Sequence, residues 1–184
     1  MNANSTNHTI FYSICYAIAD PWDWAQNLGN SWRTTNDIID NWDSMISNWD
    51  NNGPSTAAGI GHWNDPDMLV IGNPGLSLSE QRSQFAMWAI FAAPLYISAD
   101  LRIIPDASRE ILLNKDIISV NQDPLGRQGW CADCSSNRQV WVRELMPSDG
   151  RPCELGGSDR WAVVLLNLDD MFTVSRIDFD PKKH

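Results

Sequence analysis

The stretch Ser31-Trp32-Arg33-Thr34-Thr35-Asn36-Asp37 places an arginine and an aspartate four residues apart, directly after a tryptophan. A carboxyl group beside a cation and an aromatic wall has a proton affinity that its surroundings can tune. A second dense stretch, His62-Trp63-Asn64-Asp65-Pro66-Asp67-Met68-Leu69, follows about thirty residues later and carries two carboxylates, an amide and a tryptophan. Both stretches are expected where a strand gives way to a helix. We therefore predict that they act together.

Composition narrows the class of protein. The chain has 184 residues, of which 43% are hydrophobic, and this is enough for a packed core. Its formal net charge of −10 argues against nucleic acid and against anionic membrane surfaces as partners. No apolar run approaches the ~20 residues of a membrane-spanning helix. The ten tryptophans are typical of proteins that stack sugar rings, although tryptophan also simply packs in cores.

The predicted elements alternate between strands and helices up to residue 121. Strands are expected at 10–16, 57–60, 95–98 and 117–121, the first of them covered on both faces. Helices are expected from residue 37 to about 50, from the capping-box pattern at Ser77 and Glu80 to Pro94, and over 105–114. This order predicts an α/β fold with a parallel sheet and crossover helices.

After Gly126 the pattern changes. Strands are expected at 139–145, 161–167 and 173–179, with no helix between them, which predicts the start of an antiparallel domain. We place the boundary so that residues 1–128 form the first domain and residues 129–184 the second.

The cysteines predict a structural disulfide. Cys131 and Cys134 have a C-x-x-C spacing with Cys153 nearby, but no histidine follows at metal-ligand distance, so neither a zinc site nor a redox motif is expected. One disulfide among these three would leave Cys15 as a buried thiol or as the orphan of a pair.

The N-terminus carries two adjacent glycosylation sequons, at Asn4 and Asn7. They favour a secretory route, yet no signal peptide precedes them. We therefore expect that the front of the parent protein is missing from this sequence.

Four segments together resemble one known family: 29–38, 63–69, 92–95 (Ala-Ala-Pro-Leu) and 120–126 (Val-Asn-Gln-Asp-Pro-Leu-Gly). They are similar, in order and spacing from about Asn4 to Gly129, to the α-galactosidases and α-N-acetylgalactosaminidases of glycoside hydrolase family 27. The resemblance implies the last three strand–helix units of a (β/α)8 TIM barrel, followed by an incomplete antiparallel β-sandwich domain.

The resemblance also implies an activity, which is retaining hydrolysis of terminal α-linked galactose in oligosaccharides, glycolipids or glycoproteins. Asp37 matches the acid/base, and Arg33 matches a residue that binds the sugar. Asp67 and Met68 match the sugar pocket, and Asn4 matches a shared glycosylation site. No cofactor or metal is implied. The expected location is secreted, lysosomal or vacuolar, and the oligomeric state is left open.

Two departures from the family pattern affect this interpretation. The family's nucleophile lies in a Lys-x-Asp-x-Cys motif at the end of the fourth barrel strand. This motif is absent here, because the resemblance aligns Met1 just ahead of the sixth strand. We therefore expect little hydrolysis by these residues alone. Second, Cys15 is followed by Tyr16. In the family, the residue at this position helps to recognise the 2-substituent of the sugar. Both residues are assigned to substrate binding. α-N-acetylgalactosaminidase, or a non-catalytic galactoside-binding remnant, therefore remains an alternative.

Each candidate residue also has a plainer interpretation. Arg33 and Asp37 could be an ordinary i,i+4 helix pair, and Asp65 or Asp67 could be a turn residue. Trp63 is expected to line the sugar pocket, whereas His62 is expected to be structural. The remaining aromatic and acidic side chains are assigned to the core (Trp42, Trp49, Trp88), to capping (Asp100, Asp123), or to either an outer sugar or strand ends (Trp22, Trp24).

Overall fold

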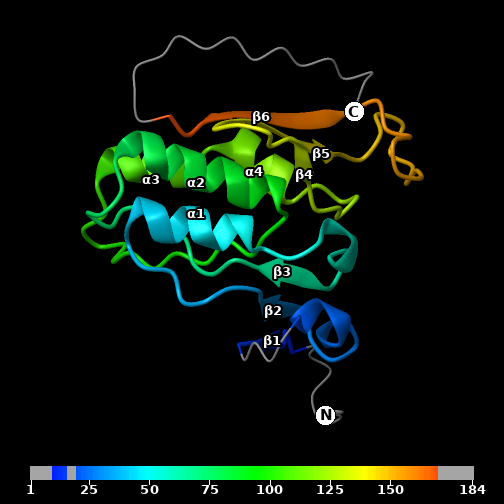
Figure 1. The fold of residues 1–184 in the computed structure, drawn as a ribbon, viewed down its shortest axis with the longest axis horizontal. Coiled ribbons are helices and arrows are strands. Elements are labelled where there is room, and N and C mark those ends of the chain that lie inside the picture. Colours follow the sequence, from blue (N-terminus) through cyan, green and yellow to red (C-terminus); the bar gives the residue numbers. More distant parts are fainter. Residues whose placement is uncertain (1–9, 16–19, 170–184) are drawn as a thin grey trace.

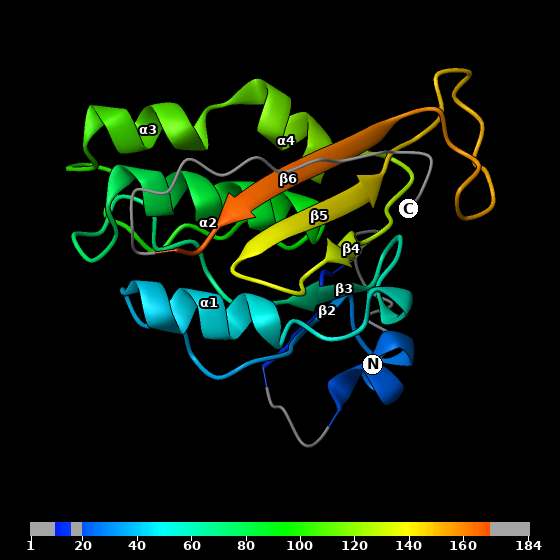
Figure 2. The same ribbon diagram turned by 45° about the horizontal axis from the view of Figure 1, so that its top comes forward.

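The computed structural model describes residues 10–15 and 20–169 of the 184. These residues form layers, with an antiparallel sheet on one side, helices α2, α3 and α4 in the middle, and α1 with a parallel sheet on the other side (Figures 1 and 2). Within this part of the chain no helix combines the length and apolar character needed to cross a membrane.

The parallel sheet contains β1 (Ser13–Ile14), β2 (Ser31–Arg33) and β3 (Trp63–Asp65), in that order across the sheet. The predicted parallel sheet is therefore confirmed, but one predicted strand is shorter than expected and another is wrong. The strand expected at 10–16 shrinks to two residues with exposed apolar neighbours, instead of lying covered on both faces. The strand expected at 57–60 is replaced by a helical turn over Ser55–Ala57, and β3 follows it.

Helix α1 (Trp42–Asp50) begins five residues later than predicted. The side chain of Asn41 accepts a hydrogen bond from the backbone N–H of Ser44 at 2.8 Å, and this cap marks the start of the helix. Met45 and Trp49 still face the core, as their spacing predicted. Asp37 consequently lies in the loop between β2 and α1 instead of on a helix.

Helix α2 (Leu78–Ile90) starts at the predicted capping box, in which Ser77 and Glu80 satisfy each other's backbone N–H groups. The pattern predicted one buried face, but the helix is buried on most of its circumference. It contacts α1, α3 and α4 as well as β5 and β6 of the antiparallel sheet. A helix between two layers must be largely apolar all round.

Helices α3 (Asp106–Leu112) and α4 (Lys115–Asn121) pack against α2. The helix predicted at 105–114 is confirmed, whereas the strand predicted at 117–121 is wrong. The side chain of Asn114 accepts hydrogen bonds from the N–H groups of Asp116 and Ile117, which caps α4. The strand predicted at 95–98 is reduced to one parallel bridge between Leu69 and Ile97.

The antiparallel sheet contains β4 (Trp130–Asp133), β5 (Arg138–Glu144) and β6 (Trp161–Asn167). The predicted strands at 139–145 and 161–167 are confirmed and β4 was missed, while the strand predicted at 173–179 lies outside the described residues. Cys131 and Cys134 form a disulfide, as predicted. Cys15 is an exposed free thiol, so of its two predicted alternatives the buried thiol is wrong, and the orphan of a pair stays a prediction.

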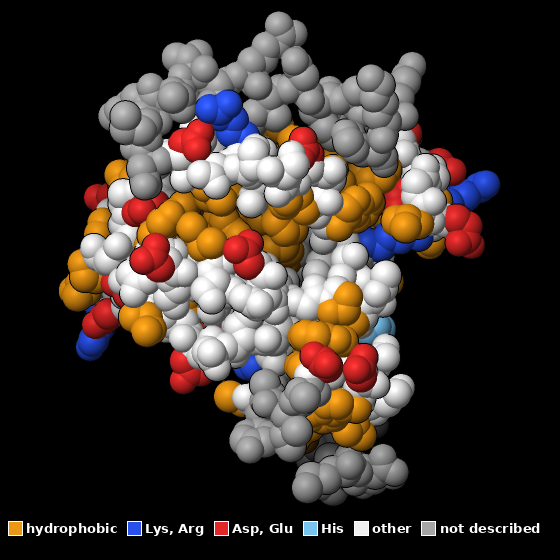
Figure 3. All heavy atoms as spheres, in the orientation of Figure 1, with side chains coloured by type: hydrophobic (Ala, Val, Ile, Leu, Met, Phe, Trp, Pro, Cys, Tyr) orange, Lys and Arg blue, Asp and Glu red, His pale blue; other side chains and the backbone are white. Residues whose placement is uncertain are grey.

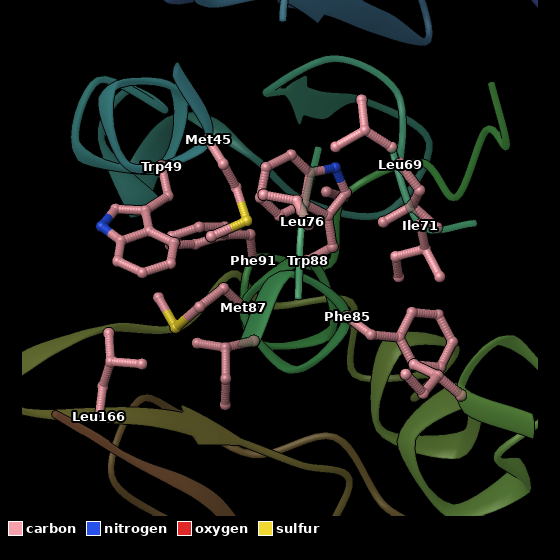
Figure 4. Packing of buried hydrophobic residues seen from close by; sticks show 14 residues of the cluster. Met45, Trp49, Leu69, Ile71, Leu76, Phe85, Met87, Trp88, Phe91 and Leu166 are labelled. Atoms are coloured by element: carbon pink, nitrogen blue, oxygen red, sulfur yellow. The ribbon is translucent and has the colours of Figure 1, made fainter. Parts of the chain in front are cut away.

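The hydrophobic core follows both sides of α2 (Figure 4). Trp88 lies on the side of Leu69 and Ile71, whereas Met87 lies on the side of Leu166 from the antiparallel sheet. The buried Arg143 of β5 joins the layers, because its guanidinium donates to the carbonyl oxygens of Ala89 in α2 and Asn121 in α4. The sheets are thus held to each other through α2.

The surface is acidic in character, and acidic groups are spread over the face shown in Figure 3. Apolar groups also reach solvent near β1, where Ile10 is 68% exposed and Phe11 and Tyr12 are each more than half exposed.

Replacing the N-cap of α2 tests the capping box. We expect Ser77→Ala to lower the free energy of unfolding by about 1 kcal/mol, because the N–H of Glu80 loses its acceptor. The exposed Ser79 in the same first turn is the control, and Ser79→Ala should change stability by less than about 0.5 kcal/mol. Urea unfolding followed by circular dichroism measures both. Equal effects of the two variants would mean that the cap does not stabilise α2.

Candidate active site

The carboxyl ends of two parallel strands bring the two polar stretches together. Arg33 at the end of β2 pairs in register with Asp65 at the end of β3. The loops that follow these strands therefore leave the sheet side by side. The backbone N–H of Thr34 donates to the carbonyl of Asp65 at 3.1 Å and ties the two loops at their base.

The side chains of Arg33, Asp37 and Asp67 form a polar cluster at these strand ends, and the guanidinium of Arg33 is its centre. Its Nη2 lies 2.7 Å from Asp67 Oδ2 and 3.2 Å from Asp37 Oδ1, and it also donates to the carbonyl of Thr35. The side chains of Arg33 and Asp67 are each 11% exposed, but that of Asp37 is 93% exposed. The cation of Arg33 therefore pairs with one buried carboxylate, that of Asp67, and with one exposed carboxylate, that of Asp37.

The plainer interpretation of Arg33 and Asp37 is only partly right. The two side chains do form an ion pair four residues apart. However, Arg33 belongs to a strand and Asp37 to a loop, so they are not neighbours on a helix. The contact depends on the path of the 34–37 loop, which Asn48 of α1 supports by donating to the carbonyls of Asn36 and Pro66.

Asp67 uses both carboxylate oxygens within the protein. Oδ2 accepts from the N–H of Ile38 at 2.7 Å as well as from Arg33, and Oδ1 accepts from the N–H of Met68 at 2.8 Å. Its backbone has φ of 82°, which non-glycine residues rarely adopt. Its carbonyl accepts from Trp88 Nε1 at 2.8 Å. Asp67 is therefore a fixed anion whose hydrogen-bonding groups are already engaged.

Asp65 is the carboxyl group that sequence reasoning underrated. Burial raises its pKa from the ordinary 3.8 to about 6, although the N–H of Asp67 and the charge of Arg33 act in the opposite direction. Its Oδ1 accepts from the N–H of Asp67 at 2.9 Å, so the predicted turn role is confirmed. Its position at the end of β3 beside Arg33 is the signal that could have marked it.

Of the other predicted substrate-binding residues, the structure describes Met68, Cys15 and Trp63. Met68 directly follows Asp67 and is 36% exposed. Cys15 follows β1 and is exposed. Tyr16 and the glycosylation sites Asn4 and Asn7 lie outside the described residues.

Trp63 lines a cavity of about 400 Å³ together with Ile60, Tyr96, Asp123 and other residues. Arg33, Asp37 and Asp67 do not contribute to the lining of this cavity. Trp63 stands at the start of β3, two residues before Asp65, and burial, followed by the charge of Asp65, raises the pKa of the cavity-lining Tyr96. Contact between Trp63 and a sugar stays a prediction.

The remaining aromatic and acidic residues mostly take the plainer roles. Trp49 and Trp88 are buried in the core as predicted, whereas Trp42 is half-buried at its edge. His62 stacks on Trp32, and Trp22 and Trp24 are half-buried. Asp100 and Asp123 accept backbone N–H groups in tight turns, as capping predicted.

The cluster combines an exposed carboxylate, a buried cation and a partly exposed apolar side chain. In the described part of the chain, histidine, cysteine, aspartate and glutamate do not gather into a group that could hold a metal ion. The exposed carboxylate of Asp37 can exchange a proton with a bound molecule. Arg33 offers a cation beside it, and Met68 offers an apolar contact.

Comparison with known proteins shows which family this sequence is similar to. Residues 3–123 match the sequence model of the family Melibiase_2, described as alpha galactosidase A. Alpha-galactosidase 3 of Arabidopsis thaliana is 50% identical over 147 residues, which cover 77% of this chain and 34% of that protein. Alpha-N-acetylgalactosaminidase of Gallus gallus is 52% identical over 128 residues, which cover 67% of this chain and 28% of that protein.

A solved structure agrees with the sequence relatives. The α-galactosidase of Saccharomyces cerevisiae with raffinose has a TM-score of 0.73 to this chain at 25% identity, covering 89% of this chain and 41% of that one. The chain spans about a third of the length of the curated relatives it matches.

Asp65 should make the stability depend on pH. Its folded-state pKa of about 6 lies above the ordinary 3.8, so its stabilising contribution is complete below pH 3.8 and is lost as the pH rises through about 6. We expect the free energy of unfolding of Asp65→Asn, relative to wild type, to increase from about pH 5 to about pH 7. Urea unfolding at several pH values measures this difference.

The control is Asp100→Asn. The hydrogen bonds from Arg102 hold the pKa of Asp100 below its ordinary value, so this group is ionised throughout that pH range. The difference in free energy of unfolding between Asp100→Asn and wild type should therefore not change with pH. A flat difference for Asp65→Asn as well would show that Asp65 does not take up a proton on folding.

Proposed function

Because this chain belongs to the family Melibiase_2, described as alpha galactosidase A, we propose that its residues form part of a retaining α-galactosidase. In this proposal they supply the acid/base and much of the sugar-binding region. The observation that carries the proposal is the bridge that Arg33 makes between the anchored Asp67 and the exposed Asp37.

Asp37 is the acid/base in this proposal. In the first step a separate carboxylate attacks the anomeric carbon, and Asp37 gives its proton to the departing glycosidic oxygen. In the second step Asp37 takes a proton from water, which attacks the glycosyl intermediate and releases galactose with retained configuration. The 93% exposure of the Asp37 side chain supports this role, because a substrate that enters from solvent can bring its glycosidic oxygen to the carboxyl group.

The attacking carboxylate comes from outside these residues. Asp67 is a poor candidate, because both of its oxygens already accept hydrogen bonds and one pairs with Arg33. Asp65 is buried and holds the turn. The family resemblance instead assigns the nucleophile to a Lys-x-Asp-x-Cys segment, which this sequence does not contain.

Arg33, Asp67 and Met68 form the sugar-binding part of the site in this proposal. Arg33 holds Asp67 in place and keeps donor capacity near the sugar, while Met68 supplies an exposed apolar surface. The substrates we propose are terminal α-galactosides, including oligosaccharides of the raffinose type. The family likeness supports this class, and the structure of the yeast relative contains raffinose.

The parallel sheet is, we propose, the last part of a (β/α)8 barrel. The exposed apolar residues beside β1 support this interpretation, because a preceding barrel strand would cover them. The antiparallel sheet would then belong to the β-domain that follows the barrel.

α-N-acetylgalactosaminidase is the second candidate function. The 52% identity to the chicken protein of that name favours it. The choice depends on the space beside the 2-position of the sugar, where the resemblance assigns Tyr16. The ratio of kcat/KM values for p-nitrophenyl α-galactoside and its N-acetylgalactosaminide decides between the two.

We also propose that the protein passes through the oxidising secretory route to a secreted, lysosomal or vacuolar location. The disulfide between Cys131 and Cys134 supports it, as do the sequons at Asn4 and Asn7.

Asp37→Asn tests the acid/base role in the protein expressed from its complete gene. We expect kcat/KM for methyl α-galactoside, which has a poor leaving group, to fall by about 10²–10⁴-fold. For 2,4-dinitrophenyl α-galactoside, which needs no protonation, the fall should be less than about tenfold, because kcat/KM reports the first chemical step. Steady-state kinetics with both substrates measure the split.

The control is Asp106→Asn, which breaks an exposed ion pair with Arg109 on α3, away from the cluster. It should leave both values unchanged. Equal losses for the two substrates in Asp37→Asn would contradict the acid/base role. A glycosyl adduct of a mechanism-based inhibitor on any carboxylate of these 184 residues would contradict the external nucleophile.

A further inference from the structure

We propose that Gln84 and Trp88, one turn apart on α2, are positioning residues that hold the loop carrying Asp67 and Met68 in its sugar-binding geometry. The inference rests on the proposed function of that loop. Both side chains are uncharged, and both form hydrogen bonds with backbone groups of the loop.

The contacts form a clamp on three residues of the loop, Asp67, Met68 and Val70. Trp88 Nε1 donates to the carbonyl of Asp67 at 2.8 Å, and Gln84 Nε2 donates to the carbonyl of Met68 at 3.4 Å. The N–H of Val70 donates to Gln84 Oε1 at 3.0 Å. Gln84 and Trp88 are both fully buried. Residues four apart lie on the same helix face, so a single face of α2 forms the hydrogen bonds with the loop backbone.

The loop needs such a clamp because its conformation is unusual. Asp67 has φ of 82°, a region that L-residues seldom occupy without support from their surroundings. This conformation directs the carboxylate towards Arg33 while the carbonyl points to Trp88. If the peptide after Asp67 rotated, the carbonyl would lose its donor inside the core, and Met68 would change direction.

Helix α2 is a rigid support for this clamp. Its first turn is closed by the capping box of Ser77 and Glu80. At its other end Asn121 Nδ2 donates to the carbonyls of Trp88 and Ala93, at 3.2 and 2.9 Å. Because α2 is also packed on several sides, with Trp88 inside the core cluster (Figure 4), Gln84 and Trp88 present their polar atoms at fixed positions.

The alternative is that Gln84 and Trp88 only satisfy buried polar groups and stabilise the core. Gln81 is the matched control, since it is buried on the same helix and also makes two hydrogen bonds. Its partners are the carbonyl of Leu76 and the hydroxyl of Ser108, which lie outside the loop. Gln84→Met and Gln81→Met therefore remove equal chemistry from the same helix.

The first test is kinetic, in the protein expressed from its complete gene, with p-nitrophenyl α-galactoside. We expect Gln84→Met to raise KM about tenfold with kcat changed less than threefold, because ground-state binding of the sugar is lost. Gln81→Met should leave KM within twofold of wild type, although urea unfolding should show a similar loss of stability. Equal KM values for the two variants would overturn the proposal.

The second test does not depend on activity. The titration of the Asp65 carboxyl is followed by ¹³C NMR in two variants, Trp88→Phe and Trp49→Phe. Trp49→Phe is the control, because it makes the same change in size at a buried tryptophan that forms no hydrogen bond with the loop. The N–H of Asp67 lowers the pKa of Asp65, and the charged or titratable groups that act on it are Arg33, Asp67 and Tyr96.

We expect the pKa of Asp65 to rise in Trp88→Phe and to stay unchanged in Trp49→Phe, because only the first variant frees the backbone of Asp67. Equal titrations in both variants would overturn the proposal. If the wild-type protein hydrolyses no α-galactoside, the proposed function fails, while the NMR comparison still decides whether Trp88 positions the loop.

Discussion

The burial of α2 between two sheets is the constraint on which the rest of the structure depends. One side of the helix packs against Leu69 and Ile71, and the other side packs against Leu166 of the antiparallel sheet. Its polar side chains are then available only for defined partners, because an unpaired polar group in this layer would be costly. The same helix therefore joins the layers and holds the loop that carries Asp67.

The polar cluster follows from this arrangement. Parallel pairing of β2 with β3 sets Arg33 beside Asp65, and the clamp from α2 turns Asp67 towards the same guanidinium. Two carboxylates, Asp37 and Asp67, thus pair with one arginine, and a third, Asp65, lies next to it in the sheet, each in different surroundings. Asp65 is buried with a raised pKa, Asp67 is anchored, and Asp37 meets solvent. Separate roles for similar groups arise from burial and hydrogen bonding, and not from residue type.

Where the sequence-based fold prediction failed, the pattern was locally ambiguous. Ile117, Ile118 and Val120 are β-branched and predicted a strand, but the cap at Asn114 and packing against α2 make this segment a helix. The expected helix start at Asp37 was wrong because Asn41 supplies the cap. The predictions at Ser77 and at 161–167 succeeded because a capping box and a seven-residue apolar strand are local signals.

The sequence by itself determined the α/β class, the capped central helix, the later antiparallel strands, and the two stretches that carry Arg33, Asp37 and Asp67. These features depend on contacts between residues close in the chain, so a linear pattern contains them. Only the tertiary structure decided that Asp65 is buried beside Arg33, that Asp67 is held in a left-handed conformation, and that Gln84 and Trp88 hold it there. Those features arise from desolvation and hydrogen bonds between distant segments, whose energies exist only after the layers have packed.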